Sequence, residues 1–493
     1  MVAFLGLDIG TSAVKAVLVD AAQCVVAGAS RPLAAMQPHP GRSEQAPEDW
    51  WRAVNDAVAE IARAAPEAWH AVKAIGLSGQ MHGLVALDAK DAVIRPAILW
   101  NDARAVAEAA ALAAIPDVAH LAGVLPMAGL TAPKALWLKA HEPENFARLA
   151  CVLLPKDYVR LCLTGEHMTD VSDAAGTLWL DQAKRDWSPA MIAASGLRLD
   201  QMPALVESPT PCGRMRPEIA RAWNLPEPPV LVGGGGDAPL GALGIGAVED
   251  GDAFISLGTS AQYFVTRDRY VAGGAEVLIH NFAQALPGRW AQVAALLNGA
   301  SCLAWFAGVF GGEIDALLHE AEARYAGPSR ALFLPYLAGE RTPHNDHNAR
   351  GLFAGLAHDT GRIDLFQAVL EGIGHALVDA QDCLRAAGAD PARLAVIGGG
   401  ARSRFWVGIL ASMLNKPLIL YDGAERGPAF GAARLARMGF TGERAAEVCT
   451  RPTICEVVEP RADLAERYAM RRPAFRALYR ETTAVSSRRP EPG

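Results

Sequence analysis

Two turns of identical sequence carry the residues with the clearest chemistry. The motif Gly-Thr-Ser-Ala occurs at residues 10–13 and again at residues 258–261, half a chain apart. In each copy an apolar run stops at the turn and resumes after it, which is typical of a strand, a tight turn and a strand. Such a turn offers backbone N–H groups and two hydroxyls to an anion, and glycine lets the backbone approach closely.

The two copies differ in one acidic residue. They align without a gap, and Asp8 in the first copy corresponds to Ser256 in the second. A single Gly-Thr-Ser turn is a common hairpin, but two copies at this spacing favour a duplicated fold that grips one polyphosphate from both sides. Asp8 is then expected to hold the metal ion that accompanies the polyphosphate.

A third candidate, Asp237, ends a run of four glycines at residues 233–236, which follows an apolar strand at residues 229–232. Consecutive glycines let the backbone pass close to a ligand or another strand. The carboxylate is either the N-cap of a following helix or a general base that takes the proton from an attacking sugar hydroxyl. The density of glycine near the expected domain junction favours the base, at the floor of an interdomain cleft.

A second glycine-rich segment, GGGARS at residues 398–403, lies between an expected strand at 394–397 and an expected helix at 404–414. Helix N-termini and consecutive glycines bind phosphate or flat rings. The spacing fits neither a P-loop nor a dinucleotide fingerprint. Tight strand–helix packing explains this segment equally well on its own, but beside the two Gly-Thr-Ser turns a nucleotide site is favoured.

Two polar loops complete the set of candidates. The first is flanked by glycines and suits a small polyol better than a protein core. The second follows an apolar strand, and its side chains either exchange hydrogen bonds with several hydroxyls or cap the start of a helix; both interpretations stay open. The residues are Gln80, Met81 and His82 in the first loop, and Asn101, Asp102 and Arg104 in the second.

The elements that must position these residues repeat in the two halves. Expected strands lie at residues 3–8, 13–20, 24–33 and 72–77 in the first half, with a helix at 47–64, and at 253–256, 262–266, 290–294 and 394–397 in the second. Three strands, a helix and a further strand form the core of the actin-like (ribonuclease H-like) ATPase fold. We therefore predict an α/β protein of two such domains with a catalytic cleft between them. Residues 1–246 are expected to form the first domain, 247–481 the second and 482–493 a disordered tail.

Bulk properties narrow the class of protein. A chain of 493 residues suggests roughly two or three domains, and a net charge of −7 argues against general nucleic-acid binding. The eight cysteines show no CxxC spacing, which excludes a zinc or dithiol motif and favours a reducing compartment. The first strand leaves no room for a signal peptide, and the charge-free stretch at 290–312 is expected to be a strand and a buried helix instead of a membrane span. We expect a cytoplasmic protein with no nucleic-acid or membrane partner; a homodimer stays open.

Taken together, these segments resemble the FGGY family of carbohydrate kinases over nearly the whole chain. The motif GQMHG at 79–83 followed by ILWNDAR at 98–104 is the subfamily-specific part, whereas the Gly-Thr-Ser turns indicate only the wider actin-like ATPase group. The resemblance implies transfer of the ATP γ-phosphate, with Mg²⁺, to a terminal hydroxyl of a ketose or polyol. It also implies that residues 1–246 are the sugar-binding domain and residues 247–481 the nucleotide-binding domain. The substrate it implies is D-xylulose, giving D-xylulose 5-phosphate; another pentulose or polyol, such as ribulose or arabitol, is the alternative.

The resemblance also implies roles for particular residues. Asp237 matches the catalytic base and Asp8 the acid beside the metal, and both are expected near Mg²⁺. The expected sugar-binding residues are Gln80, Met81, His82, Trp100, Asn101 and Asp102, of which Met81 and His82 match the substrate-contacting pair. The expected ATP-binding residues are Thr11, Ser12, Lys15, Gly258 and Thr259 on the phosphate side, and Gly399, Gly400 and Ala401 on the adenosine side.

One position departs from the family pattern. Ala238 stands where related pentulose kinases usually carry Asn, and Pro239 follows, which biases Ala238 toward extended backbone. A methyl group cannot hydrogen-bond a sugar, so the departure concerns sugar identity and affinity, not kinase chemistry. The sequence disfavours two other classes of protein. A catalytically silent sensor is disfavoured because Asp8 and Asp237 are both present, and an actin- or chaperone-like ATPase because the two polar loops have no place there.

Overall fold

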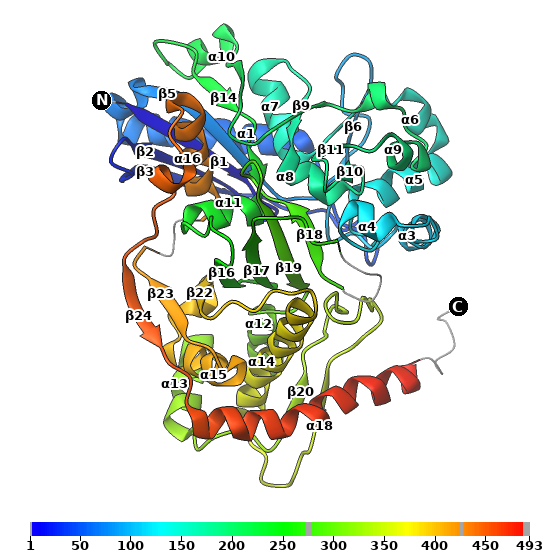
Figure 1. The fold of residues 1–493 in the computed structure, drawn as a ribbon, viewed down its shortest axis with the longest axis vertical. Coiled ribbons are helices and arrows are strands. Elements are labelled where there is room, and N and C mark those ends of the chain that lie inside the picture. The colour runs from blue at the N-terminus through cyan, green and yellow to red at the C-terminus, as the bar shows by residue number, and fades with distance from the viewer. Residues whose placement is uncertain (1, 273–277, 424–426, 487–493) are drawn as a thin grey trace.

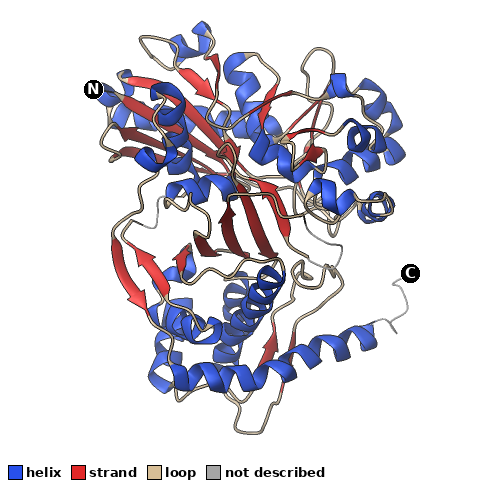
Figure 2. Cartoon of the chain, viewed as in Figure 1, coloured by secondary structure: helices blue, strands red, loops and turns tan. Residues whose placement is uncertain are grey.

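A computed structural model describes residues 2–272, 278–423 and 427–486. The first half builds a seven-stranded sheet in which β1, β2 and β3 form an antiparallel meander, while β5 lies parallel to β1 and β14 parallel to β5 (Figures 1 and 2). The strands are β1 (Ala3–Ile9), β2 (Ala13–Asp20), β3 (Val25–Pro32), β5 (Val72–Gly79), β13 (Pro211–Arg214), β14 (Val230–Val232) and β15 (Gly235–Gly236). Helix α1 (Pro47–Ala64) begins with Pro47 and buries one apolar face, which includes Trp50, Val54 and Ile61.

The second half repeats this plan. Its sheet has the order β18-β19-β17-β16-β22-β23-β24, with β16, β17 and β19 antiparallel and β22 parallel to β16. The strands are β16 (Ala253–Leu257), β17 (Ala261–Arg267), β18 (His280–Ala283), β19 (Trp290–Leu296), β22 (Leu394–Ile397), β23 (Leu418–Tyr421) and β24 (Ile454–Val458). The helices are α12 (Ser301–Phe310), α13 (Ile314–Arg324), α14 (Arg362–Ala386), α15 (Arg404–Leu414), α16 (Pro428–Thr441), α17 (Ala445–Val448) and α18 (Ala462–Ser486), and a small hairpin is formed by β20 (Leu332–Leu334) and β21 (Leu352–Ala354).

Smaller elements surround the first sheet, most of them inserted between β5 and β14, and several carry loops of the site. The strands among them are β4 (Glu44–Gln45), β6 (Val85–Leu87), β7 (Ala97–Ile98), β8 (Cys151–Leu153), β9 (Met168–Asp170), β10 (Leu180–Asp181), β11 (Asp186–Trp187) and β12 (Ala204–Val206). The helices are α2 (Pro66–His70), α3 (Val106–Ala113), α4 (Val118–Ala122), α5 (Thr131–His141), α6 (Pro143–Arg148), α7 (Pro155–Thr164), α8 (Val171–Ala174), α9 (Pro189–Ala194), α10 (Pro217–Ala222) and α11 (Asp237–Gly244).

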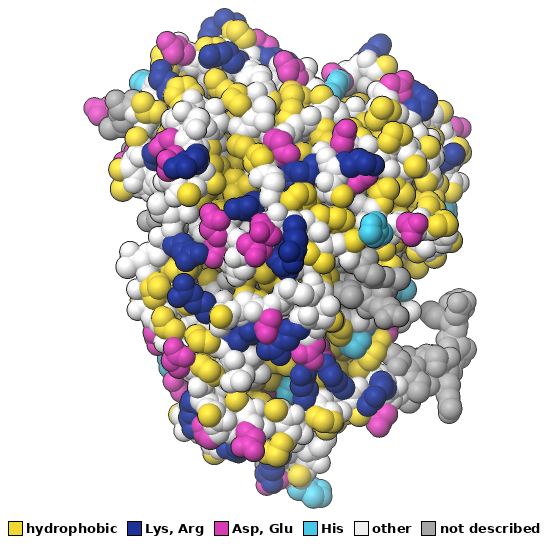
Figure 3. All heavy atoms as spheres, viewed as in Figure 1, with side chains coloured by type: hydrophobic (Ala, Val, Ile, Leu, Met, Phe, Trp, Pro, Cys, Tyr) yellow, Lys and Arg dark blue, Asp and Glu magenta, His cyan; other side chains and the backbone are white. Residues whose placement is uncertain are grey.

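The predicted two-sheet, actin-like α/β architecture is confirmed. The charge-free stretch forms β19 followed by α12, as expected. Among the described residues no single helix is both long and apolar enough to cross a membrane; α12 and α13 meet that test only as a pair bent by 92°. On the face in Figure 3, basic and acidic side chains are interspersed.

The two Gly-Thr-Ser hairpins differ in register by one residue. Ile9 pairs with Val14, whereas its counterpart Leu257 pairs with Ala261, so the first turn holds four residues and the second three. A shift of one residue moves side chains to the opposite face of a strand. Lys15, opposite Asp8, is exposed, whereas Tyr263, which aligns with Lys15 in sequence, is fully buried. The gap-free repeat in sequence therefore does not extend to strand pairing.

Helix α16 belongs by sequence to the second half but packs on the sheet of the first (Figure 1). A Cβ at Gly6 would lie 1.9 Å from the carbonyl oxygen of Ala429, and one at Gly76 would lie 2.0 Å from that of Ala432. These approaches require glycine in β1 and β5. A boundary at residues 246–247 thus separates the two sheets but not all the helices that cover them.

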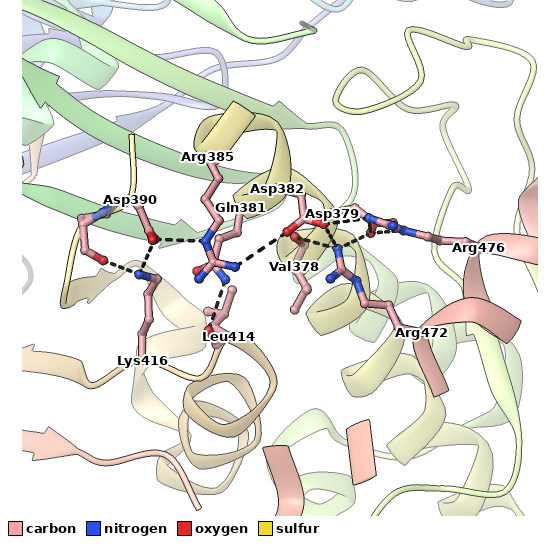
Figure 4. A network of polar contacts seen from close by, with 11 residues as sticks. Val378, Asp379, Gln381, Asp382, Arg385, Asp390, Leu414, Lys416, Arg472 and Arg476 are labelled. Carbon is pink, nitrogen blue, oxygen red and sulfur yellow. Dashed lines mark hydrogen bonds and ion pairs between the residues drawn. The ribbon is translucent and has the colours of Figure 1, made fainter. Parts of the chain in front are cut away.

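Helix α18 extends to Ser486, so it includes the first five residues of the tail expected to be disordered at 482–493; residues 487–493 lie outside the described residues. Arg472 and Arg476 of α18 form ion pairs with Asp379 and Asp382 of α14 (Figure 4). Further along α18, Tyr479 stacks on His344, with ring centroids 3.6 Å apart. These contacts fix the helix close to its end, and propagation of an anchored helix adds a hydrogen bond per residue at little cost.

Candidate active site

A cavity of about 160 Å³ lies between the two halves, and both halves line it. The first half contributes Thr11, Met81, His82, Trp100, Asp237, Ala238 and Pro239. The polar residues from the second half are Ser260, Gln262, His280 and Arg341. The first Gly-Thr-Ser turn, the GQMHG loop, the end of the glycine run and the second turn therefore meet around one space.

Asp237 is the first residue of α11, and the N-cap position is occupied by Gly236. Its Oδ1 accepts a hydrogen bond from the N–H of Ala238 at 2.8 Å. A Cβ at Gly236 would lie 2.7 Å from Sδ of Met81, so the glycine run lets Met81 pack directly against the backbone that precedes Asp237. Burial, and secondarily the charge of Asp8, raises the pKa of Asp237 to about 7. A carboxylate with such a pKa is suited to general base catalysis near neutral pH.

Asp8 lies at the carboxyl end of β1 and is 7% exposed. Its Oδ1 accepts a hydrogen bond from Oγ of Ser78 on β5 at 2.9 Å. Burial raises the pKa of Asp8, against the opposing effects of Ser78 and Lys15. Among the described residues no group of three or more His, Cys, Asp and Glu side chains is arranged to hold a metal ion. The buried Asp8 and the partly exposed Asp237 suit Mg²⁺, which takes one or two carboxylates and completes its octahedron with phosphate oxygens and water.

Hydrogen bonds within the protein hold the first turn. Thr11 Oγ1 donates to Oε1 of Gln80 and accepts from Nε1 of Trp100, both at 2.9 Å. Nε2 of Gln45 donates to the carbonyl oxygen of Thr11 at 2.7 Å, and Nε2 of Gln80 donates to Oε1 of Gln45 at 3.0 Å. Gln80 is 1% exposed and supports the turn from behind the cavity. Gln45, which the sequence did not single out, links the turn to the rest of the first half.

His82 presents one nitrogen to the cavity in a defined state. Its backbone has φ 70°, and its Nδ1 lies 2.8 Å from the carbonyl oxygen of Gly176. Burial, followed by the charge of Arg341, holds the pKa of His82 well below its usual value, so the ring is neutral. Nδ1 then carries the proton and Nε2 accepts a hydrogen bond. The carbonyl oxygen of His82 accepts from Nζ of the buried Lys134 at 2.8 Å, a contact that the sequence did not predict.

The second polar loop separates into two parts. Trp100 lines both the cavity with Asp237 and a neighbouring hollow of about 580 Å³, whereas Asn101 and Asp102 line only the hollow. The Asp102 oxygens accept from the N–H of Ser43 at 2.6 Å and from Nε and Nη2 of Arg104 at 2.8 and 2.7 Å. Asp102 therefore anchors the loop to Ser43, and helix α3 has no side-chain cap. Contact of Asn101 and Asp102 with a sugar stays a prediction.

The expected adenosine-side loop lies in the second half. Gly399 and Gly400 line a pocket of about 580 Å³ with Leu318 and Phe405, while Ala401 is buried beneath them. A Cβ at Gly400 would lie 2.6 Å from the Trp406 ring. Glycine at 400 thus serves the tight strand–helix packing considered at the outset, and the open pocket beside it has room for a flat ring.

The expected phosphate-side residues lie at the two turns. The side chains of Ser12, Lys15 and Thr259 are exposed. The carbonyl oxygens of Gly258 and Thr259 accept hydrogen bonds from the backbone ahead of α12, from Ala300 N at 2.8 Å and Gly299 N at 3.1 Å. The second turn is therefore held rigidly, with its hydroxyl side chain free to face a ligand.

Comparison with known proteins identifies the class. Residues 3–244 match the N-terminal domain of the FGGY family of carbohydrate kinases and residues 253–440 match its C-terminal domain. The chain belongs to this family.

Relatives found from the sequence and from the structure have similar names. The chain is 44% identical over 481 residues, 97% of its length and 99% of the relative's, to the xylulose kinase of Escherichia coli (strain K12). It superposes with a TM-score of 0.94 and 43% identity on the crystal structure of a protein described as a xyloylose kinase from Brucella ovis, over 98% of this chain and 100% of that one. The xylulose kinase from Rhodospirillum rubrum aligns with a TM-score of 0.88 and 29% identity over 99% of this chain and 100% of that one.

Proposed function

We propose that this chain transfers the γ-phosphate of ATP to the terminal hydroxyl of D-xylulose, giving D-xylulose 5-phosphate. The observation that carries the proposal is the cavity in which Asp237 and His82 of the first half face Ser260 of the second Gly-Thr-Ser turn. The names of the relatives with 43–44% identity support the choice of sugar.

In this proposal Asp237 accepts the proton of the attacking hydroxyl. Its carboxylate stands at the N-terminus of α11 with one oxygen held by Ala238 N, which leaves the other oxygen for the sugar. Nε2 of His82 accepts a hydrogen bond from a second hydroxyl, and Met81 and Trp100 provide apolar faces for the carbon chain. Because the transition state of phosphoryl transfer is loose, the contribution of these residues is largely positioning and electrostatic.

Asp8 and Asp237 would hold Mg²⁺, which neutralises charge on the transferred phosphate. The charge of Asp8 makes ionisation of Asp237 more costly when no cation is present. Thr11, Ser12 and Lys15 on one side, and Gly258 and Thr259 on the other, would contact phosphate oxygens. The pocket beside Gly399, Gly400 and Ala401 would take the adenosine. In this proposal residues 1–246 bind the sugar and residues 247–481 bind the nucleotide. Helix α16 of the second domain packs on the sheet of the first.

A second candidate function is a kinase of another pentulose, and the position of Ala238 supports this candidate. Ala238 lines the cavity next to Asp237. An asparagine at this position would therefore present its amide to the proposed sugar site, whereas alanine presents only a methyl group. The expected bias toward extended backbone does not apply, because Ala238 is helical. Pro239 is tolerated in the first turn of α11, because the backbone N–H groups of that turn lack intrahelical partners.

The test is ADP release with D-xylulose, D-ribulose, D-arabitol and glycerol as acceptors, with the product of the best acceptor identified by ³¹P NMR. The proposal requires the highest kcat/KM with D-xylulose and a phosphate on its terminal hydroxyl. A higher kcat/KM with D-ribulose would select the second candidate, and ADP release that no sugar stimulates would contradict both.

A further inference from the structure

Arg341 is the only Lys or Arg among the described residues that line the cavity. It comes from the second half of the chain, in the loop between β20 and β21, and the uncharged polar residues Ser260, Gln262 and His280 line the cavity from the same half.

The loop that carries Arg341 is held firmly. Glu340 and Asp346 exchange two backbone hydrogen bonds of 2.8 Å, and the Glu340 carboxylate accepts from Leu297 N at 2.6 Å and from Arg341 N at 2.8 Å. Tyr479 of α18 donates to Oδ2 of Asp346 at 3.0 Å. The guanidinium is therefore placed by a braced loop and not by a mobile one.

The guanidinium reaches across to the first half. Its Nη2 donates to the carbonyl oxygen of Trp100 at 3.2 Å, and its carbon lies 5.6 Å from the centroid of the Trp100 ring. No carboxylate forms an ion pair with Arg341 in the part of the chain that the structure describes. A guanidinium has five N–H donors and no acceptor. One donor is used by Trp100, so further donors are available to a ligand in the cavity.

The other polar groups of the first half have little donor capacity left for a ligand. Thr11 donates its hydroxyl proton to Gln80, and Trp100 donates its N–H to Thr11. The Nδ1 proton of His82 is directed at Gly176, which leaves an acceptor, and Asp237 as a base is an acceptor too. These groups suit sugar hydroxyls, which can donate. A ketose also has one carbonyl oxygen, which can only accept.

We propose that Arg341 donates a hydrogen bond to the carbonyl oxygen of the ketose and so selects ketoses over the corresponding polyols. This inference rests on the proposed ketose kinase function. In a polyol the same oxygen bears a proton, which must find an acceptor in a corner already occupied by a donor-only side chain. A site with a buried polar group discriminates against analogues that leave groups there unpaired.

The experiment compares D-xylulose with xylitol and D-arabitol, the two alcohols obtained by reducing its carbonyl. Binding of each is titrated by calorimetry with Mg²⁺ and a non-hydrolysable ATP analogue, for the wild type, Arg341→Met and Arg341→Lys. A hydrogen bond from a charged donor corresponds to about 10- to 100-fold in affinity. We expect Arg341→Met to weaken D-xylulose binding by this factor, with at least about fivefold less loss for both alcohols, and Arg341→Lys to recover part of the difference. Arg330→Met, at an exposed arginine paired with Asp359, is the control and should change none of the three.

Equal losses for the three ligands in Arg341→Met, with an unchanged melting temperature, would overturn the inference. So would a lower kcat with unchanged binding of all three, which would place the guanidinium on the transferred phosphate. Tighter wild-type binding of an alcohol than of any ketose would overturn it as well. Failure of the proposed function is seen separately: if the wild type prefers D-ribulose, the comparison is repeated with D-ribulose and its two reduced alcohols.

Discussion

Replacing Asp237 by Asn should reduce activity and increase stability, and the two effects have the same physical origin. The asparagine retains an oxygen that can accept from Ala238 N but cannot take a proton. General base catalysis contributes about 10²–10⁴-fold, so kcat should fall by that factor, which corresponds to about 2.7–5.5 kcal/mol in activation free energy. Most of the ATP affinity should persist, because the pocket proposed for adenosine lies beside Gly399 and Gly400 and does not include Asp237.

The stability gain can be worked out from the pKa. Folding raises the pKa of Asp237 from 3.8 to about 7, so the folded state binds more protons than the unfolded one between these values. Wild-type stability therefore declines through this carboxyl as pH rises from about 4 to about 7 and stays lower above it. A shift of about three units amounts to at most about 4 kcal/mol, and less in practice because Asp237 is partly exposed to the cavity.

The assay is urea unfolding of wild type and Asp237→Asn without Mg²⁺, at pH 5.5 and pH 8, beside steady-state kinetics at pH 8. The variant should gain more stability over wild type at pH 8 than at pH 5.5. Asp200→Asn, at an exposed position, is the control for the charge change. A gain that is the same at both pH values, or a kcat within tenfold of wild type, would refute the reasoning.

Three further outcomes are expected. Asp8→Asn should raise the Mg²⁺ concentration needed for half-maximal rate and lower kcat, while Ser256→Ala should have a much smaller effect; equal losses in an Mg²⁺ titration would show that the asymmetry between the repeats has no metal role. Ala238→Asn should lower KM for the preferred ketose by roughly 2- to 12-fold, the value of one neutral hydrogen bond; if kcat/KM for D-xylulose and D-ribulose keeps the same ratio, Ala238 does not contact the sugar. Arg472→Met should reduce the free energy of unfolding by about 1 kcal/mol without altering kcat, because Asp379 keeps its other arginine partner; a change in kcat would indicate that α18 acts on the site.

Local signals in the sequence were enough for most elements. Helix α1 begins at Pro47 and α15 follows the GGGARS segment, both with the predicted bounds, because proline, glycine and apolar periodicity act within a few residues. The cavity likewise brings together Thr11, His82 and Asp237, which the sequence singled out. Each of these stands at the end of a strand or on a glycine-flanked loop, and the ends of neighbouring parallel strands meet at one edge of a sheet.

Contacts between segments distant in the sequence could not be predicted from local signals. The loop motif around Asp102 left a sugar contact and a helix cap open, and it gave no signal for the hydrogen bonds that Asp102 accepts from Ser43 and Arg104. The packing of α16 against Gly6 and Gly76 has no local signal, because a glycine in a strand does not specify which helix will approach it.

The sequence by itself determined the kind of chemistry and the fold class. The repeated turns, the glycine runs and Asp8, whose counterpart in the second repeat is Ser256, are all properties of short segments. Only the tertiary structure decided which side chains remain available to a ligand. It directed the Nδ1 proton of His82 to Gly176, buried Ala401 next to the pocket that Gly399 and Gly400 line, and brought Arg341 to Trp100. The hydrogen-bond partners of these side chains lie far away in the sequence. Which donors and acceptors remain available to a ligand is therefore determined only when the two halves pack together.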